Sequence, residues 1–170
     1  MHLYFTEETP APELTVEYCH GLSQWALEHC IFDDVIFSTI HGSYLYGTAH
    51  QDSDIDIFIV RESDKNKSTN IDNIDVQVLN LETFLRLAQT GCHQAVEALY
   101  SPYKKFSNTP YRPFIEHIRV SPYGFVKKTL SVAKAFCARG TVKGLQHAHR
   151  LEESAQQMLC GEYSPVWKPL

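Results

Sequence analysis

The residues best suited to chemistry in this chain are three aspartates in its first half. Asp54 and Asp56 flank Ile55 in a segment that predicts a strand, and Asp75 lies in another such segment, residues 74–79. Side chains alternate between the two faces of a strand, so Asp54 and Asp56 point the same way. Carboxylates that project together repel one another, and a hard divalent cation removes that repulsion. We therefore expect Asp54, Asp56 and Asp75 to bind two Mg²⁺ or Mn²⁺ ions as catalytic ligands for in-line phosphoryl transfer.

A Gly-Ser pair precedes these acids and provides a candidate phosphate site. Residues 35–40 predict a buried strand that ends at Gly42. Glycine has no Cβ to block a close approach, and N–H groups at the start of a following helix attract anions. Ser43 adds a hydroxyl donor, so we expect Gly42 and Ser43 to bind nucleotide phosphates. Tyr44 and Tyr46 could stack on a base, but tyrosines in a short helix after such a turn are more often core residues.

A second group of candidate nucleotide-binding residues lies near the end of the chain. Lys143, His147 and Arg150 are spaced i, i+4 and i+7, which places them on one face of a predicted helix, residues 142–159. On the functional interpretation this face presents cations to a triphosphate, and Arg150 grips phosphate oxygens with both arms of its guanidinium. The alternatives are a solvated helix face or an internal pair with Glu153. The acidic half of the chain needs a cationic counterpart, which favours the functional interpretation.

The elements that must position these residues form an α+β pattern. Apolar periodicity and β-branched runs predict a small sheet with helices before and after it. No P-loop or G-x-G-x-x-G motif is present, which counts against ATPase and dinucleotide-binding classes. The polar segment 65–70 predicts an exposed turn, and residues 108–113 predict a loop. The predicted strands are residues 35–40, 55–60 and 74–79, and the predicted helices are residues 15–30, 82–89, 94–99, 125–138 and 142–159.

Length and composition indicate one domain spanning residues 1–170. A chain with 44% hydrophobic residues can bury a core without disulfides or structural metals. We expect an extended lead-in at residues 1–13, a catalytic core at 14–100 and a basic, mainly helical part at 101–170. The five cysteines form no C-x-x-C pair, so we expect buried free thiols. No apolar run is long enough to span a membrane and no basic signal start is present, which predicts a cytoplasmic protein.

Charge is divided unevenly between the two halves of the chain. Residues 1–102 hold 4 Lys and Arg against 16 Asp and Glu, a balance of −12. Residues 103–170 hold 11 against 4, a balance of +7, and together they give the net charge of −5. By itself this division is typical of two solvated faces of opposite sign. Together with the motifs, it predicts that one half gathers cations and the other gathers anions.

At these residues the sequence resembles the DNA polymerase β-like nucleotidyltransferase superfamily. That pattern is a Gly-Ser pair, a short helix, Asp-x-Asp and a later Asp on a strand. Its counterparts here are Gly42-Ser43, Asp54-x-Asp56 and Asp75. A longer motif, Gly-Ser-x-x-x-Gly-Thr-x-x-x-x-Ser-Asp-Ile-Asp at residues 42–56, looks like one branch, the YcgL-like or RlaP-like nucleotidyltransferases of bacteria and bacteriophages. Residues 96–99 and 143–161 look like further segments of that branch, so the resemblance covers roughly residues 35–162.

This resemblance implies a fold and an activity. The fold is a small mixed sheet flanked by helices, with a C-terminal helical part. The activity is the Mg²⁺-dependent transfer of a nucleoside monophosphate from a nucleoside triphosphate, such as ATP, to an acceptor hydroxyl, with release of pyrophosphate. Members modify RNA ends, proteins and small molecules, so the acceptor and the oligomeric state stay open.

Two other classes of function are compatible with parts of the sequence. One is a catalytically weak nucleotide sensor or antitoxin-like module on the same fold, which three intact acids disfavour because simple binding does not require them. The other is general binding of single-stranded nucleic acid by the basic second half of the chain. The net negative charge makes that a poor main function, although an RNA acceptor stays compatible.

Overall fold

A computed structural model describes residues 5, 11, 13–63, 67–71 and 74–167. Most of the expected lead-in, residues 1–13, lies outside the described residues. Phe5 is one exception: it pairs with Cys30 as an isolated bridge and packs against Trp25.

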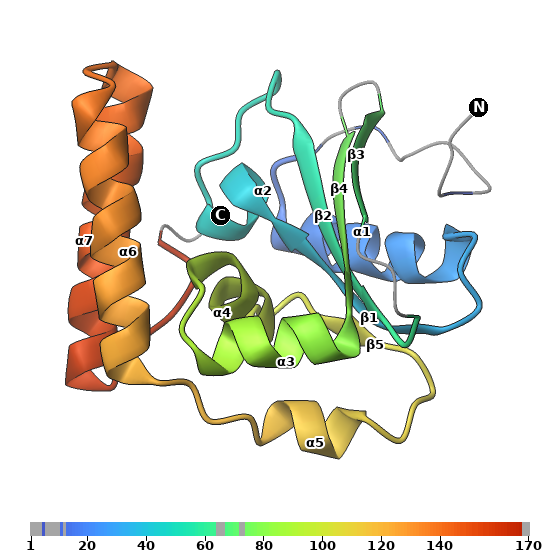
Figure 1. Ribbon diagram of the computed structural model, residues 1–170. Coiled ribbons are helices and arrows are strands. Elements are labelled where there is room, and N and C mark those ends of the chain that lie inside the picture. The colour runs from blue at the N-terminus through green and yellow to red at the C-terminus, as the bar shows by residue number, and fades with distance from the viewer. Residues whose placement is uncertain (1–4, 6–10, 12, 64–66, 72–73, 168–170) are drawn as a thin grey trace.

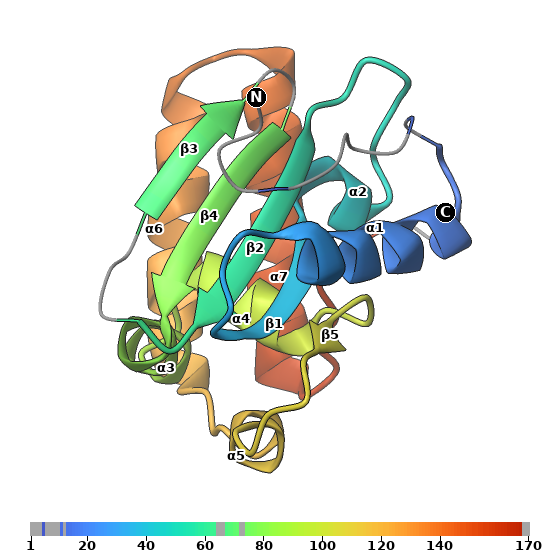
Figure 2. The ribbon, with the colours of Figure 1, turned by 90° about the vertical axis from the view of Figure 1, so that its right-hand side faces the viewer.

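Five strands form one mixed sheet in the order β3-β4-β2-β1-β5 (Figures 1 and 2). The strands are β1 (Val35–His41), β2 (Ile55–Arg61), β3 (Lys67–Ile71), β4 (Ile74–Asn80) and β5 (Lys105–Phe106). Strands β2 and β4 run parallel, whereas every other neighbouring pair is antiparallel. Two parallel neighbouring strands need a crossover connection between them. Between β2 and β4 the chain makes this crossover through the edge strand β3.

Seven helices surround the described part of the sheet. They are α1 (Val16–His29), α2 (Gly42–Tyr46), α3 (Leu81–Gln89), α4 (His93–Tyr100), α5 (Arg112–Glu116), α6 (Pro122–Ala138) and α7 (Val142–Cys160). Helix α1 covers one face of the sheet, and α3 and α4 lie on the other side (Figure 1). Helices α6 and α7 form an antiparallel hairpin beyond α4. The expected α+β class is thus confirmed, and no described helix is long and apolar enough to cross a membrane.

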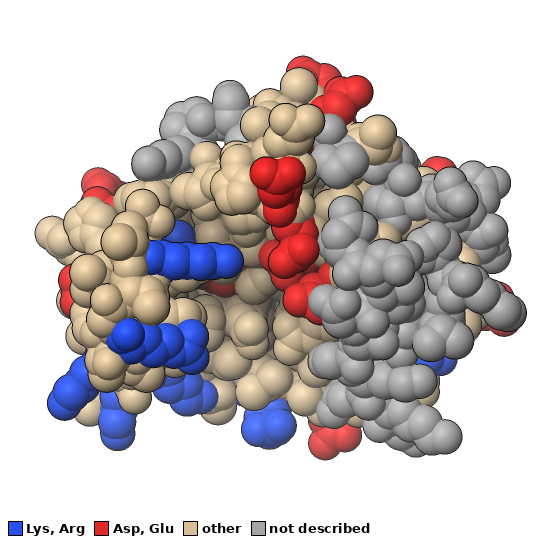
Figure 3. Space-filling view, turned by 90° about the horizontal axis from the view of Figure 1, so that it is seen from above, with Lys and Arg blue, Asp and Glu red and all other residues tan. Residues whose placement is uncertain are grey.

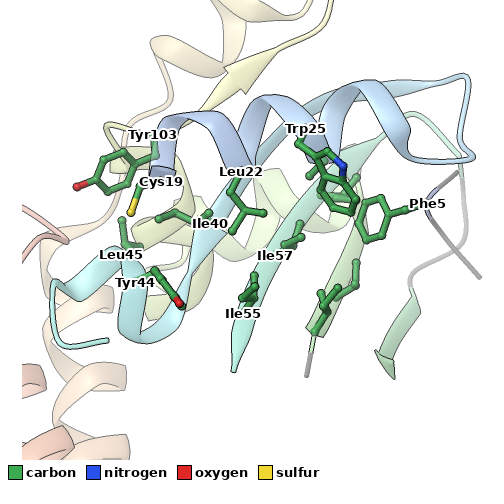
Figure 4. Close-up of a cluster of buried hydrophobic side chains, with 14 of the residues drawn as sticks. Phe5, Cys19, Leu22, Trp25, Ile40, Tyr44, Leu45, Ile55, Ile57 and Tyr103 are labelled. Carbon is green, nitrogen blue, oxygen red and sulfur yellow. The ribbon is translucent and has the colours of Figure 1, made fainter. Parts of the chain in front are cut away.

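Strand alternation divides the core into two layers. On the α1 side, every second residue of β2 and β4, such as Ile57 and Val76, belongs to one cluster with Leu22 and Trp25. Figure 4 shows Ile55 and Ile57 of β2 beneath Leu22 and Trp25 of α1. On the other side, Phe58 and its neighbours pack against α3, α4 and α5. Tyr44 and Tyr46 are both buried, as expected for core residues. Because Asp54 and Asp56 share the alternation of Phe58, they belong to the second side.

Three sequence expectations were wrong. Residues 65 and 66 of the turn expected at 65–70 lie outside the described residues, and residues 67–70 belong instead to the edge strand β3, which pairs with the backbone of β4 without any need for an apolar pattern. The loop expected at residues 108–113 gives way to α5 at Arg112, where Pro113 occupies the first turn, a position that tolerates its missing N–H. The cysteines are free as expected, but Cys137 and Cys160 are exposed.

Candidate active site

The register of two parallel strands brings two of the three acids together. In the pairing of β2 with β4, Asp56 lies opposite Asp75. Neighbouring strands are about 4.8 Å apart, so these carboxylates project side by side from the same face of the sheet. Asp54 comes directly before β2 and is exposed, as is Asp75. All three candidate ligands therefore lie at one end of the central strand pair.

Gly42 makes a closer contact with Asp56 than any other residue type could. Its φ is +62°, in the left-handed region that favours glycine. A Cβ atom built on Gly42 would lie 1.8 Å from Oδ2 of Asp56, which is far inside van der Waals contact. The Gly-Ser pair and the acids therefore belong to one site, in which the start of α2 rests on the Asp56 carboxylate.

The environment of Asp56 disfavours its charge. Burial raises the pKa of Asp56 to about 6, and the neighbouring charges of Asp75 and Asp54 act in the same direction. His41 and Lys143 oppose this effect without overcoming it. A bound cation would stabilise the charged form of a carboxylate in these surroundings.

These acids line a cleft whose other wall is basic. The cleft has a volume of about 950 Å³ and runs between the strand ends and the first half of α7. Its lining includes Gly42 and Ser43, the three acids, and Lys143, Gln146, His147, Arg150 and Trp167. Figure 3 shows acidic side chains along one side of a hollow and basic side chains on the opposite side. The structure thus brings together every residue that the sequence predicted for the site.

Below the cleft, one buried carboxylate joins four elements. Glu97 of α4 is only 1% exposed. Its Oε1 accepts a hydrogen bond from Nη1 of Arg150 at 2.7 Å, and its Oε2 accepts one from the hydroxyl of Tyr46 at 3.0 Å. His41 at the end of β1 places Nε2 3.0 Å from the same Oε2. Burial alone would raise the pKa of Glu97, but Arg150 and His41 hold it well below its usual range.

Arg150 is the main partner of this buried carboxylate. The side chain is buried, with its guanidinium carbon 3.5 Å from the centre of the Tyr46 ring. Arg150 does form an internal pair, but its partner is Glu97 and not Glu153. The pair with Glu97 uses Nη1, whereas Nε has no hydrogen-bond partner among the described residues. Arg150 also lines the cleft, so its expected contact with phosphate stays a prediction, although Glu97 already balances its charge.

The other two residues of the helix face differ from each other. Lys143 is exposed at the start of α7, and its charge acts on Asp56 across the cleft. Burial lowers the pKa of His147, and the nearby charges of Arg150 and Lys143 lower it further. His147 is therefore mainly neutral at pH 7, so it offers hydrogen bonds to a ligand and not a charge. Only Lys143 presents an exposed positive charge on this face.

The donor set fits a hard divalent cation. Carboxylate oxygens on neighbouring strands are the ligands that Mg²⁺ prefers, together with substrate phosphates. Within the described residues, no three His, Cys, Asp or Glu side chains form a ready-made metal site. Such sites keep several positions for water and phosphate, so two or three carboxylates suffice. The metal ligands therefore stay a prediction that the charge at Asp56 supports.

Sequence reasoning missed three residues of this region. His41 directly precedes the Gly-Ser pair and lies opposite Asp56 in the pairing of β1 with β2. Glu97 stands among Ala95, Val96, Ala98 and Leu99, and an acid inside an apolar run is a signal for a buried, paired carboxylate. Trp167 reaches the cleft from the chain after α7, where its indole N–H donates to Glu153. No spacing rule could have placed it there.

Breaking the buried pair should destabilise the protein. Arg150→Ala leaves the Glu97 charge buried without its main partner, so we expect the free energy of unfolding to fall by about 3–5 kcal/mol. Urea denaturation measures this change. Lys143→Ala removes an exposed cation of the same helix and should change stability by less than about 0.5 kcal/mol. An Arg150→Ala protein as stable as the native one would mean that the pair does not hold α7 in place.

Asp56 should make the metal-free protein less stable as the pH rises. Its pKa is about 6 in the fold and 3.8 for an ordinary aspartate, so its contribution to stability is present below about pH 4 and lost as pH rises through 6. Asp56→Asn should therefore raise the free energy of unfolding at pH 7.5 in EDTA by about 1–3 kcal/mol, and much less at pH 4. The control is Asp52→Asn, which removes an exposed acid from the loop that precedes β2. Equal effects of both substitutions would refute a special environment for Asp56.

Comparison with known families supplies a classification. The family model for the nucleotidyltransferase domain matches residues 25–119, more than half of the chain. The match contains the Gly-Ser pair, all three acids and Glu97, whereas α6 and α7 lie outside it. A comparison with curated proteins found no match. The chain belongs to the nucleotidyltransferase domain family, within the DNA polymerase β-like superfamily.

Proposed function

We propose that this chain is a metal-dependent nucleotidyltransferase that moves a nucleoside monophosphate from a nucleoside triphosphate to an acceptor hydroxyl and releases pyrophosphate. One observation carries the proposal: Asp56 lies opposite Asp75 and directly beneath Gly42, in a cleft that faces Lys143. Simple nucleotide binding does not need paired carboxylates beside a phosphate site, because they repel a triphosphate. We also assign the chain to the YcgL-like or RlaP-like branch, on the helix motif at residues 143–161.

Asp54, Asp56 and Asp75 would hold two Mg²⁺ or Mn²⁺ ions. When bound, these ions neutralise charge on the phosphates and lower the pKa of the acceptor hydroxyl. Asp54 and Asp75 lie at the same end of the central strand pair as Asp56, and Gly42 leaves room for the Asp56 carboxylate at the start of α2. The raised pKa of Asp56 fits this role, since a cation takes the place that a proton otherwise occupies.

The remaining site residues would bind and orient the triphosphate. Ser43 donates its hydroxyl to the terminal phosphates at the start of α2. Lys143 attracts the phosphates from the opposite wall, and His147 adds a neutral hydrogen-bonding group beside it. Arg150 keeps α7 in position through Glu97. In the transfer step the acceptor oxygen bonds to the α-phosphorus and its hydroxyl proton passes to solvent. The bond from that phosphorus to the bridging oxygen breaks, and pyrophosphate leaves with the electron pair.

The direct test is transfer of label. The protein is incubated with each α-labelled nucleoside triphosphate, Mg²⁺ or Mn²⁺, and a cell extract, and each fraction is examined for incorporated label. We expect one class of macromolecule or metabolite to become labelled. Absence of label in every fraction, with triphosphate binding intact, would contradict transfer and favour the nucleotide sensor.

Asp75→Asn should separate binding from transfer. The substitution keeps the size and removes the charge, so triphosphate should still bind within a few fold of the native protein while transfer nearly stops. Asp54→Asn and Asp56→Asn should impair both, because these residues would contact both ions. Asp52→Asn is the matched control, since Asp52 also lines the cleft but lies outside the strand register. Native turnover by Asp75→Asn under saturating Mg²⁺ would remove Asp75 from the site.

A further inference from the structure

Helix α7, at the edge of the molecule (Figure 1), has large apolar side chains on its outer face. Its inner face packs against α6 through Ala148 and Leu151. A helix that is covered on one side only is normally polar on the other. On the outer face of α7, however, Val142 is 75% exposed, Leu145 is 52% exposed and Leu159 is 67% exposed. Exposed apolar side chains that share a helix face are typical of a contact with another protein.

These side chains belong to a regular stripe of exposed residues, which we call the outer stripe. Its members are separated alternately by three and four positions, the heptad spacing with which two helices pack along each other. They are Val142, Leu145, His149, Glu152, Gln156 and Leu159. The outer stripe runs almost the whole length of α7, about 26 Å at the rise of an α-helix. Its spacing therefore fits a second helix as the partner.

The outer stripe is complementary to itself when a second copy runs antiparallel. In that arrangement the apolar ends meet, because Val142 of one copy faces Leu159 of the other. The polar centre then places His149 opposite Glu152 twice, so that each carboxylate faces an imidazole that can donate a hydrogen bond to it. A parallel arrangement would instead place Glu152 beside its own counterpart, and like charges that face each other across an interface are unfavourable. Charge complementarity thus selects both the occupant and its direction.

We propose that two copies of this chain associate along the outer stripe of α7, antiparallel and about a twofold axis that passes between His149 and Glu152. A single pair of helices of this length makes a small interface, so the dimer is weak and its dissociation constant lies in the micromolar range. The cleft stays open in the dimer, because its residues on α7, such as Lys143 and His147, lie on another face of the helix. The association does not depend on the proposed transfer.

Sedimentation velocity of the full chain tests the association, between about 1 and 200 μM so that a micromolar dissociation constant is bracketed. We expect the average mass to rise toward twice that of the monomer. Leu145→Glu/Leu159→Glu brings acids into the interface and should weaken association by about tenfold or more. The control Ile31→Glu/Phe114→Glu changes two equally exposed apolar side chains elsewhere and should leave association unchanged. A native chain that stays monomeric throughout would overturn the proposal, and so would equal losses in both variants.

Exchange of charges tests the antiparallel direction. His149→Glu places two acids opposite each other at both central contacts and should weaken association by about threefold or more. The double variant His149→Glu/Glu152→Lys restores opposite charges and should return the dissociation constant to within about twofold of the native value. Circular dichroism of each variant checks that the fold is kept. A double variant as weak as His149→Glu would contradict the antiparallel pairing. Dimers that form while no acceptor is ever labelled would count against the proposed function alone.

Discussion

The buried carboxylate of Glu97 is the interaction on which the rest of the site depends. It lies in an apolar helix where a lone charge would be strongly unfavourable, and Arg150, Tyr46 and His41 make it tolerable. Each partner comes from a different element: α7, α2 and the end of β1. The carboxylate therefore fixes the basic wall of the cleft relative to the element that carries the Gly-Ser pair. Loss of that link would leave the two walls without a defined separation.

The two walls of the cleft carry opposite charge and are built in different ways. The acidic wall is built by backbone geometry: strand register sets Asp56 beside Asp75, and Gly42, which has no Cβ, leaves room for the Asp56 carboxylate. The basic wall is built by side-chain packing through Glu97. A triphosphate alone would be repelled by the first wall and attracted by the second. Cations bound to the acids would remove that repulsion, so we expect metal and nucleotide each to strengthen the binding of the other.

The sequence predicted the parts of the site that depend on local spacing. Alternation placed Asp54 and Asp56 on one face, and helical spacing placed Lys143, His147 and Arg150 together. It could not show which residues face each other across the fold. The match of Asp56 with Asp75 depends on a crossover through β3, a strand whose polar sequence carries no strand pattern. The partner of Arg150 is 53 positions away in the chain, so the nearby Glu153 was the natural but wrong candidate.

The most direct test of a metal-dependent site is the coupling between metal binding and nucleotide binding. Calorimetric titration with a non-hydrolysable nucleoside triphosphate, with Mg²⁺ and then with EDTA, gives that coupling as a ratio of affinities. We predict that Mg²⁺ strengthens binding to the native protein by about tenfold or more, which corresponds to about 1.4 kcal/mol. In Asp56→Asn the enhancement should largely disappear while metal-free binding is unchanged or tighter. Equal affinity of the native protein with and without Mg²⁺ would contradict a metal-dependent site built on Asp56.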